Sequence, residues 1–121
     1  MNELRLDDYL EQIESAARRA LEFVGAQSRE EFLADIKTQH AVAMSFAVMG
    51  DAATRIAAAY PDFIARTLEI SWRDMRGMRH HLVHAYMRID HKVIWHTLQN
   101  ELPPLLRDIT RLRAQLSADG R

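Results

Sequence analysis

Apolar residues recur at intervals of three and four along almost the whole of this chain of 121 residues. Such spacing places them on one face of an α-helix, whereas a half-buried strand requires apolar and polar residues to alternate. No stretch of the chain alternates convincingly. The clearest helix covers roughly residues 3–25, with an apolar face made of Leu6, Tyr9, Leu10, Ile13, Ala17, Leu21 and Val24. The pattern predicts an all-α fold, an antiparallel up-and-down bundle of four to five helices.

Residues that start and stop helices divide the rest of the chain. Ser28 followed by Glu31 is a capping box, in which each side chain satisfies a free backbone N–H group. It predicts one long second helix that ends near Tyr60-Pro61. The segment 62–69 is expected to add a short turn of helix.

Two further helices are predicted in the second half. One begins near Ser71 and runs toward His84. Asp90 is the expected N-cap of the last helix. Pro103-Pro104 should kink or restart that helix, because proline lacks the backbone donor that a helix interior needs.

Length and composition narrow the class of protein. The chain is expected to form one domain over residues 1–121. It has no cysteine, so disulfides and thiolate catalysis are excluded. No apolar run approaches the roughly 18 residues of a membrane span, and the first residues do not resemble a secretory signal. A cytoplasmic protein that does not contact a membrane is therefore expected.

Charge is unevenly distributed although the net charge is only −1. Residues 1–70 contain seven Lys and Arg against twelve Asp and Glu. Residues 71–96 contain five basic residues against two acidic ones, and five of the six histidines. Two interpretations stay open: this segment forms an ordinary solvated basic helix face, or it forms a local anion site on an otherwise acidic protein.

The basic segment contains the pattern R-x-x-x-x-H-x-Y, formed by Arg79, His84 and Tyr86. Arginine offers a permanent cation and a planar set of donors that suits phosphate. Histidine is the side chain best suited to proton transfer near neutral pH. Together these groups provide what cleavage of a phosphodiester needs when no metal takes part.

Helical geometry constrains how this motif can work. Arg79 falls on the apolar stripe that includes Trp72 and Met75, so it should meet an acid, a phosphate or a polar cleft. Asp51 on the preceding long helix is one possible partner, and a purely structural ion pair remains an alternative. Arg79 and His84 lie about 140° apart on a straight helix. The motif therefore requires either that the helix ends before His84 or that a second copy of the chain completes the site.

Other histidines and aromatic residues have simpler interpretations. His80 and His84 have the four-residue spacing of two zinc ligands on a helix, but no third ligand stands at a suitable spacing, so no metal site is predicted. His40 is expected to be a hydrogen-bonded core histidine, and Trp95 a core aromatic.

Beyond these spacings, the segment resembles the HepT-like family within the HEPN superfamily. The resemblance rests on Trp72, Met75 to Arg79, Leu82 to Tyr86, Ile89-Asp90, Val93 to Trp95, Leu102-Pro103 and Gly50 to Ala52. His80 stands where Asn is common in that family, and Asp51 where Glu is expected in a Gly-Glu-Ala motif.

The resemblance implies a small homodimeric helical bundle that acts as a metal-independent endoribonuclease, with no cofactor. Arg79 and His84 would be catalytic and His80 and Asp51 supporting. Tyr86 would be the tyrosine that receives AMP from an MntA-type nucleotidyltransferase, the antitoxin of a type VII-like toxin–antitoxin system. The cations expected to guide RNA are Arg73, Arg76 and Arg88. The alternative is a catalytically silent nucleotide- or protein-binding accessory subunit of such a nucleotidyltransferase.

Overall fold

The structure, a computed structural model, describes residues 5–84, apart from the side chain of Val83, and residues 88–119. All regular structure within these ranges is helical, which confirms the predicted all-α class. The elements are α1 (Leu6–Val24), α2 (Arg29–Ala34), α3 (Ile36–Ala59), α4 (Pro61–Arg66), α5 (Trp72–His84), α6 (His91–His96), a π-helical segment (Thr97–Glu101) and α7 (Leu102–Ala118).

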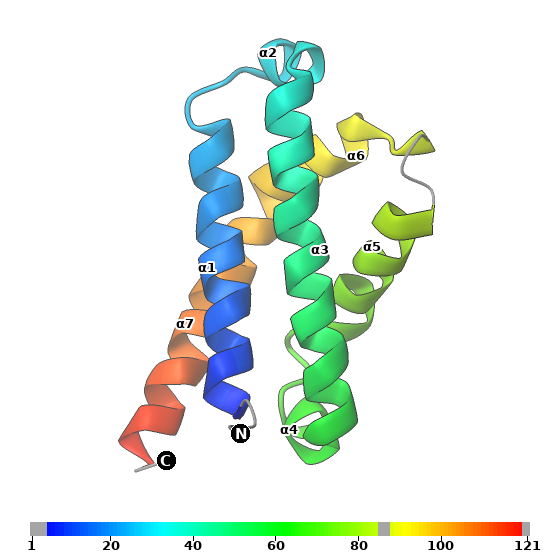
Figure 1. Cartoon of the computed structure of the whole chain (residues 1–121). Helices are drawn as coiled ribbons and strands as arrows, with labels where there is room; N and C mark the ends of the chain where they lie inside the picture. The colour runs from blue at the N-terminus through cyan, green and yellow to red at the C-terminus, as the bar shows by residue number, and fades with distance from the viewer. Residues whose placement is uncertain (1–4, 85–87, 120–121) are drawn as a thin grey trace.

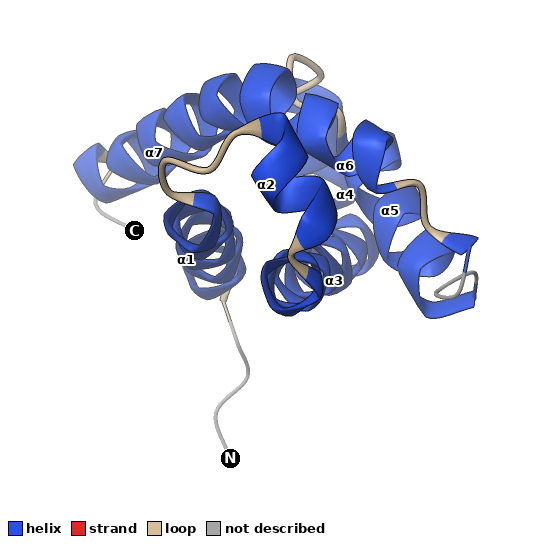
Figure 2. Ribbon diagram, turned by 90° about the horizontal axis from the view of Figure 1, so that it is seen from above, coloured by secondary structure: helices blue, strands red, loops and turns tan. Residues whose placement is uncertain are grey.

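The long helices form a bundle in which α3 lies between α1 and α5 (Figures 1 and 2). Helix α7 packs against α1, and the short α2 crosses one end of the bundle beside α6. Helix α4 lies at the opposite end, where α1 begins and α7 ends (Figure 1). Because α5 packs mainly on α3, one side of α5 faces away from the body of the bundle.

The core consists of the apolar faces that the periodicity predicts. Its fully buried side chains include Leu10 and Ile13 of α1, Ile56 of α3 and Ile109 of α7. Full burial of each such side chain contributes roughly 1.5–3 kcal/mol to the free energy of unfolding. The expected helix over roughly residues 3–25 corresponds to α1, and Trp95 packs against Phe32 beside this core, with ring centroids 5.6 Å apart.

The predicted capping box is present, but the helix it starts is short. Ser28 Oγ accepts from the Glu31 N–H, and Glu31 accepts from the Ser28 N–H. Helix α2 then ends at Asp35, so the prediction of one continuous helix to residue 60 is wrong. Asp35 adopts extended backbone angles and starts α3 as its N-cap, accepting from the backbone and hydroxyl of Thr38. Hydrogen bonds from Thr38 and Gln27 also lower the pKa of Asp35.

The last predicted helix is divided as its proline pair suggested. Asp90 caps α6 by accepting from the Lys92 N–H at 2.9 Å, as expected. The chain then widens into the π-helical segment, in which the N–H of Leu102 bonds to the carbonyl of Thr97. Helix α7 begins at Leu102, and its first turn holds the prolines, whose missing N–H groups are not needed there.

Helix α3 corrects the expectation that no apolar run approaches the length of a membrane span. By length and composition alone it is apolar enough to cross a membrane, with a mean hydropathy of 1.2 over its best window. Half of that window is buried inside the bundle, as in the central helix of a folded domain. Its apolar character is therefore accounted for by contacts with α1 and α5.

A cluster of charged residues joins α7 to α1. Arg113 donates to Asp7 at 2.9 Å and to Glu14 at 2.8 Å, and Thr110 also donates to Glu14 at 2.6 Å. Burial raises the pKa of Glu14, but the hydrogen bonds from Thr110 and Arg113 outweigh it, so this pKa lies below its ordinary value of 4.5.

We predict that Glu14→Gln lowers the free energy of unfolding at neutral pH by about 1–2 kcal/mol, because a charge-assisted hydrogen bond is lost. A lowered carboxyl pKa stabilises the fold above the unfolded-state pKa, and this stabilisation disappears as pH falls through the folded-state value. The difference between wild type and variant, measured by urea denaturation, should therefore shrink below pH 4.5. Glu22→Gln, on the exposed part of α1, is the control and should change little.

Candidate active site

Helix α5 carries Arg79 and His84 of the motif and lies unusually close to α3 at Gly50. A Cβ atom added to Gly50 would collide with the Cβ of Arg79 and would lie 2.8 Å from the carbonyl oxygen of Met75. Only glycine permits this approach, because the second collision is with backbone that cannot rotate away. The contact places the residue after Gly50 beside Arg79.

That residue is Asp51, which forms the predicted pair with Arg79. Asp51 Oδ1 lies 3.6 Å from Arg79 Nε, and Asp51 Oδ2 accepts from Arg55 Nε at 2.9 Å. Although Arg79 falls on the apolar stripe, its side chain is 44% exposed, and only its Cα and Cβ atoms pack against Gly50. Among the described residues Arg79 has no other ion pair, so its terminal nitrogens remain available to an anion.

The motif histidine His84 and the supporting His80 share one exposed face of α5. The rings of His80 and His84 are exposed and their centroids lie 4.4 Å apart. Helix α5 extends through His84, so the possibility that the helix ends before this residue is not realised. Arg79 and His84 therefore leave the helix about 140° apart, and one chain does not aim both at one atom.

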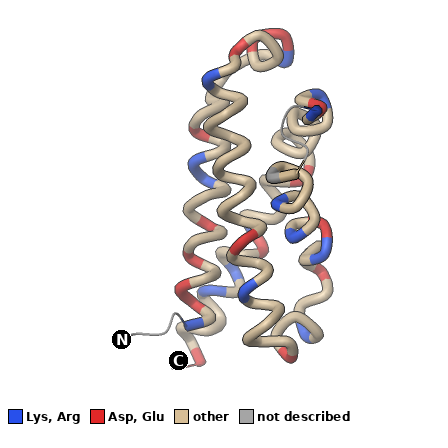
Figure 3. The backbone as a smooth tube through the Cα atoms, turned by 45° about the vertical axis from the view of Figure 1, so that its right-hand side comes forward, with Lys and Arg blue, Asp and Glu red and all other residues tan. Residues whose placement is uncertain are grey.

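The three cations predicted to guide RNA are all exposed to solvent. Arg73 and Arg76 are exposed on α5, and Arg88 is exposed beyond its end. Figure 3 shows mainly basic residues along α5, whereas α1 carries both acidic and basic residues. Tyr86 lies outside the described residues.

The burial of His40 differs from what the sequence suggested, and that of His91 was not predicted. His40 is exposed, so the prediction of a core histidine is wrong; the buried polar residue is its neighbour Gln39, which donates to the carbonyl of Phe32. His91 packs edge-on against Phe32, and its buried Nδ1 forms no hydrogen bond with a residue that the structure describes. Burial and the nearby charge of His40 lower the pKa of His91. The sequence did not indicate this contact of His91 with Phe32. It shows only that His91 is the first residue after the Asp90 cap.

The described residues contain no group of three or more His, Cys, Asp or Glu side chains arranged to hold a metal ion. The chemistry that the site offers is thus a partly paired arginine and two adjacent imidazoles, a set suited to binding a phosphate and transferring a proton.

Comparison with known proteins connects this arrangement to one family. The family model described as "Ribonuclease HepT-like" matches residues 13–112, which include Asp51, Arg79 and His84. A protein of Thermococcus cleftensis named "Probable ribonuclease HepT" is 39% identical over 106 residues, covering 88% of this chain and 94% of that protein.

Two more distant relatives have similar names. A candidate RNase of Methanocaldococcus jannaschii is 32% identical over 92 residues, covering 76% of this chain and 74% of the relative. A candidate RNase of Caldanaerobacter subterraneus is 27% identical over 104 residues, covering 86% and 90%. No solved structure matches the chain.

The Gly50 contact yields a prediction with a matched control. Gly50→Ala should lower the free energy of unfolding by about 1–3 kcal/mol, because α3 and α5 must move apart. Gly77→Ala on α5 should raise it by about 0.5–1 kcal/mol, because alanine favours a helix and its Cβ would meet nothing within 4 Å. Urea denaturation measures both. Equal stability of Gly50→Ala and wild type would contradict the close helix contact.

Proposed function

This chain belongs to the ribonuclease HepT-like family, and we propose that it is a metal-independent endoribonuclease. The observation that carries the proposal is the exposed Arg79, paired with Asp51 through the Gly50 contact and followed five residues later by the exposed His84. All of these residues lie inside the segment that the family model matches.

The proposed reaction uses the nucleophile that RNA itself carries. The ribose 2′-hydroxyl attacks the adjacent phosphorus and gives its proton to one His84, while a second His84 protonates the leaving 5′-oxygen. The new 2′-O–P bond and the broken P–O5′ bond leave a 2′,3′-cyclic phosphate and a 5′-hydroxyl. Arg79 stabilises the added negative charge of the phosphorane, with Asp51 and His80 holding the arginine and the motif face in place.

A homodimer would supply the two histidines. One helix points Arg79 and His84 in different directions, so a complete site requires a second chain. The stripe of α3 that carries Asp51 also carries Met44 and Val48, whose side chains are 66% and 39% exposed. These side chains border α1, and an exposed apolar surface on the helix that carries Asp51 supports a two-fold contact through α3.

The RNA backbone would be guided by the cations around the motif. Arg73 and Arg76 lie on the same helix as Arg79, and Arg88 lies just beyond it, all exposed. The excess of basic over acidic residues in this segment favours local binding of phosphates over general coating of nucleic acid, which the net charge of −1 opposes.

We further propose that the chain acts in the cytoplasm as the toxin of a type VII-like toxin–antitoxin pair. An MntA-type nucleotidyltransferase would add AMP to Tyr86, two residues after His84. Each AMP brings a phosphate charge that would pair with Arg79 or Arg88 and a nucleobase that would block the RNA path.

The catalytic role is tested with labelled RNA in the presence of EDTA. His84→Ala should cleave about 10²–10⁴-fold more slowly than wild type, since proton transfer is lost. Arg79→Ala should cleave roughly 10²–10³-fold more slowly because charge stabilisation is lost. Circular dichroism should show unchanged helix content in both variants.

A mixture of wild-type and His84→Ala chains tests the dimer. If each site uses the His84 of both chains, co-refolding wild type with an excess of His84→Ala should lower cleavage further than dilution of the wild type alone explains, because a mixed dimer retains only one His84. Cleavage by His84→Ala at the wild-type rate would disprove the chemistry. Intact RNA at high concentrations of wild-type protein would favour the silent accessory subunit.

The modification is tested on Tyr86→Phe, which keeps the ring and lacks the acceptor oxygen. Wild-type protein incubated with the cognate nucleotidyltransferase and ATP should gain multiples of the mass of AMP and lose activity. The variant should gain no mass and retain cleavage, as measured by intact-mass spectrometry and an RNA assay. The same mass gain on Tyr86→Phe would place the modification on another residue.

A further inference from the structure

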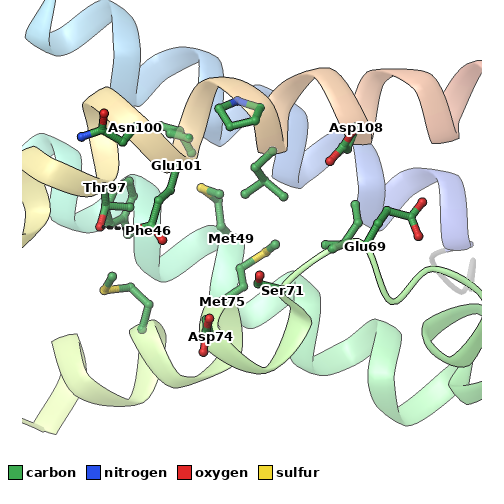
Figure 4. A pocket seen from close by; sticks show the side chains of 15 residues that line it. Phe46, Met49, Glu69, Ser71, Asp74, Met75, Thr97, Asn100, Glu101 and Asp108 are labelled. Atoms are coloured by element: carbon green, nitrogen blue, oxygen red, sulfur yellow. Dashed lines mark hydrogen bonds between the residues drawn. The ribbon is translucent and has the colours of Figure 1, made fainter.

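A cavity lies on the flank of α5 that faces α3 and α7. This cavity of about 330 Å³ opens between α5, α3, the π-helical segment and the start of α7 (Figure 4). Phe46 and Met49 of α3, Met75 of α5 and Leu102 of α7 line its apolar part, and all four side chains are buried or nearly so. A concave apolar surface of this size is large enough to receive a ligand or the side chains of a partner.

The lining carries four carboxylates, whereas no Lys, Arg or His is among the described residues that line it. At one end Glu69 and Asp108 both pair with Arg111, at 3.2 and 3.5 Å. The guanidinium of Arg111 thus shows that carboxylates of this rim can pair with an arginine.

Elsewhere on the rim of this cavity, the carboxylates form no ion pair with a residue that the structure describes. Glu101 accepts only from the hydroxyl of Thr97, at 3.2 Å, and Asp74 has no hydrogen bond or ion pair with any residue that the structure describes. Figure 4 shows Met49 and Met75 between Glu101 on one side of the cavity and Asp74 on the other. An apolar centre with carboxylates left unpaired at its edge is complementary to an apolar group flanked by positive charges.

The shape of the hollow favours an elongated occupant. Asp74 and Met78 also line a neighbouring cavity of about 450 Å³, whose lining includes the apolar Val93 and Ile94 together with Arg73 and His81. Three of the lining residues are methionines, Met49, Met75 and Met78. Methionine side chains adapt to different apolar shapes, and such surfaces commonly receive amphipathic helices.

We propose that this groove along α5 binds a basic amphipathic helix of a partner protein. Apolar side chains of that helix enter among Met49, Met75 and Met78, and its Lys or Arg residues pair with Asp74 and Glu101. The four carboxylates of the cavity between α3, α5 and α7 would repel RNA, so this cavity is distinct from the proposed active site, and only the neighbouring cavity reaches Arg73. The inference does not depend on the chain being a ribonuclease.

The test uses methyl NMR of protein labelled at its methionines. The probe is a synthetic helical peptide of leucine and lysine with leucine on one face, and its control is the same peptide with each lysine replaced by glutamate. The lysine peptide should shift the methyl signals of Met49, Met75 and Met78. Met44, exposed on the opposite side of α3 beside α1, is the internal reference and should not shift. The glutamate peptide should shift none of the four.

A charge-neutral double variant tests the rim. Asp74→Asn with Glu101→Gln should weaken the lysine peptide about fivefold, as expected for the loss of two exposed ion pairs. Glu22→Gln with Glu30→Gln makes the same change of net charge on exposed residues outside the groove and should bind the peptide as wild type does.

Three results would overturn the proposal: shifts at Met44 equal to those in the groove, equal binding of the lysine and glutamate peptides, or equal weakening by both double variants. A fall in the mass of the protein assembly in the rim variant, measured by sedimentation, would overturn it as well. That result would assign the groove to contact with a second copy of this chain.

Discussion

The close approach of α3 and α5 at Gly50 is the contact on which the geometry of the candidate site depends. It brings the backbone of α5 so near that no side chain fits at this position. Asp51 then lies beside Arg79, and the arginine leaves the core for solvent while one side of its guanidinium remains paired. A wider separation of the helices would remove both the pairing and the direction of the arginine.

Helix α5 separates two surfaces of opposite chemical character. Arg76, Arg79, His80 and His84 are exposed on α5 and suited to a polyanion, whereas the flank of α5 toward α7 borders an apolar cavity edged with carboxylates. This division is possible because α5 packs mainly on α3 and leaves its remaining surface uncovered. A net charge near zero conceals the division, since the two surfaces largely cancel in the sum.

Much of the helical arrangement followed from local rules. The Ser28–Glu31 capping box and the Asp90 cap are each formed by groups within three residues, so short-range hydrogen bonding is sufficient to predict them. The break at Asp35 was missed because the apolar pattern continues across it. Hydrogen bonds from Thr38 and Gln27 to one carboxylate decide the break, and Gln27 lies eight residues away in sequence.

The order of residues by itself determined the helical class, most helix ends and the motif that indicates phosphate chemistry, because these depend on spacing along one helix. Only the tertiary structure decided that Arg79 is exposed and paired, that His40 is outside the core, and that an acidic apolar groove lies behind the motif. Each of these depends on which helices meet and how closely they pack. A periodic pattern shows that a helix has an apolar face. It does not show which helix packs against that face, or how closely α3 and α5 approach each other at Gly50.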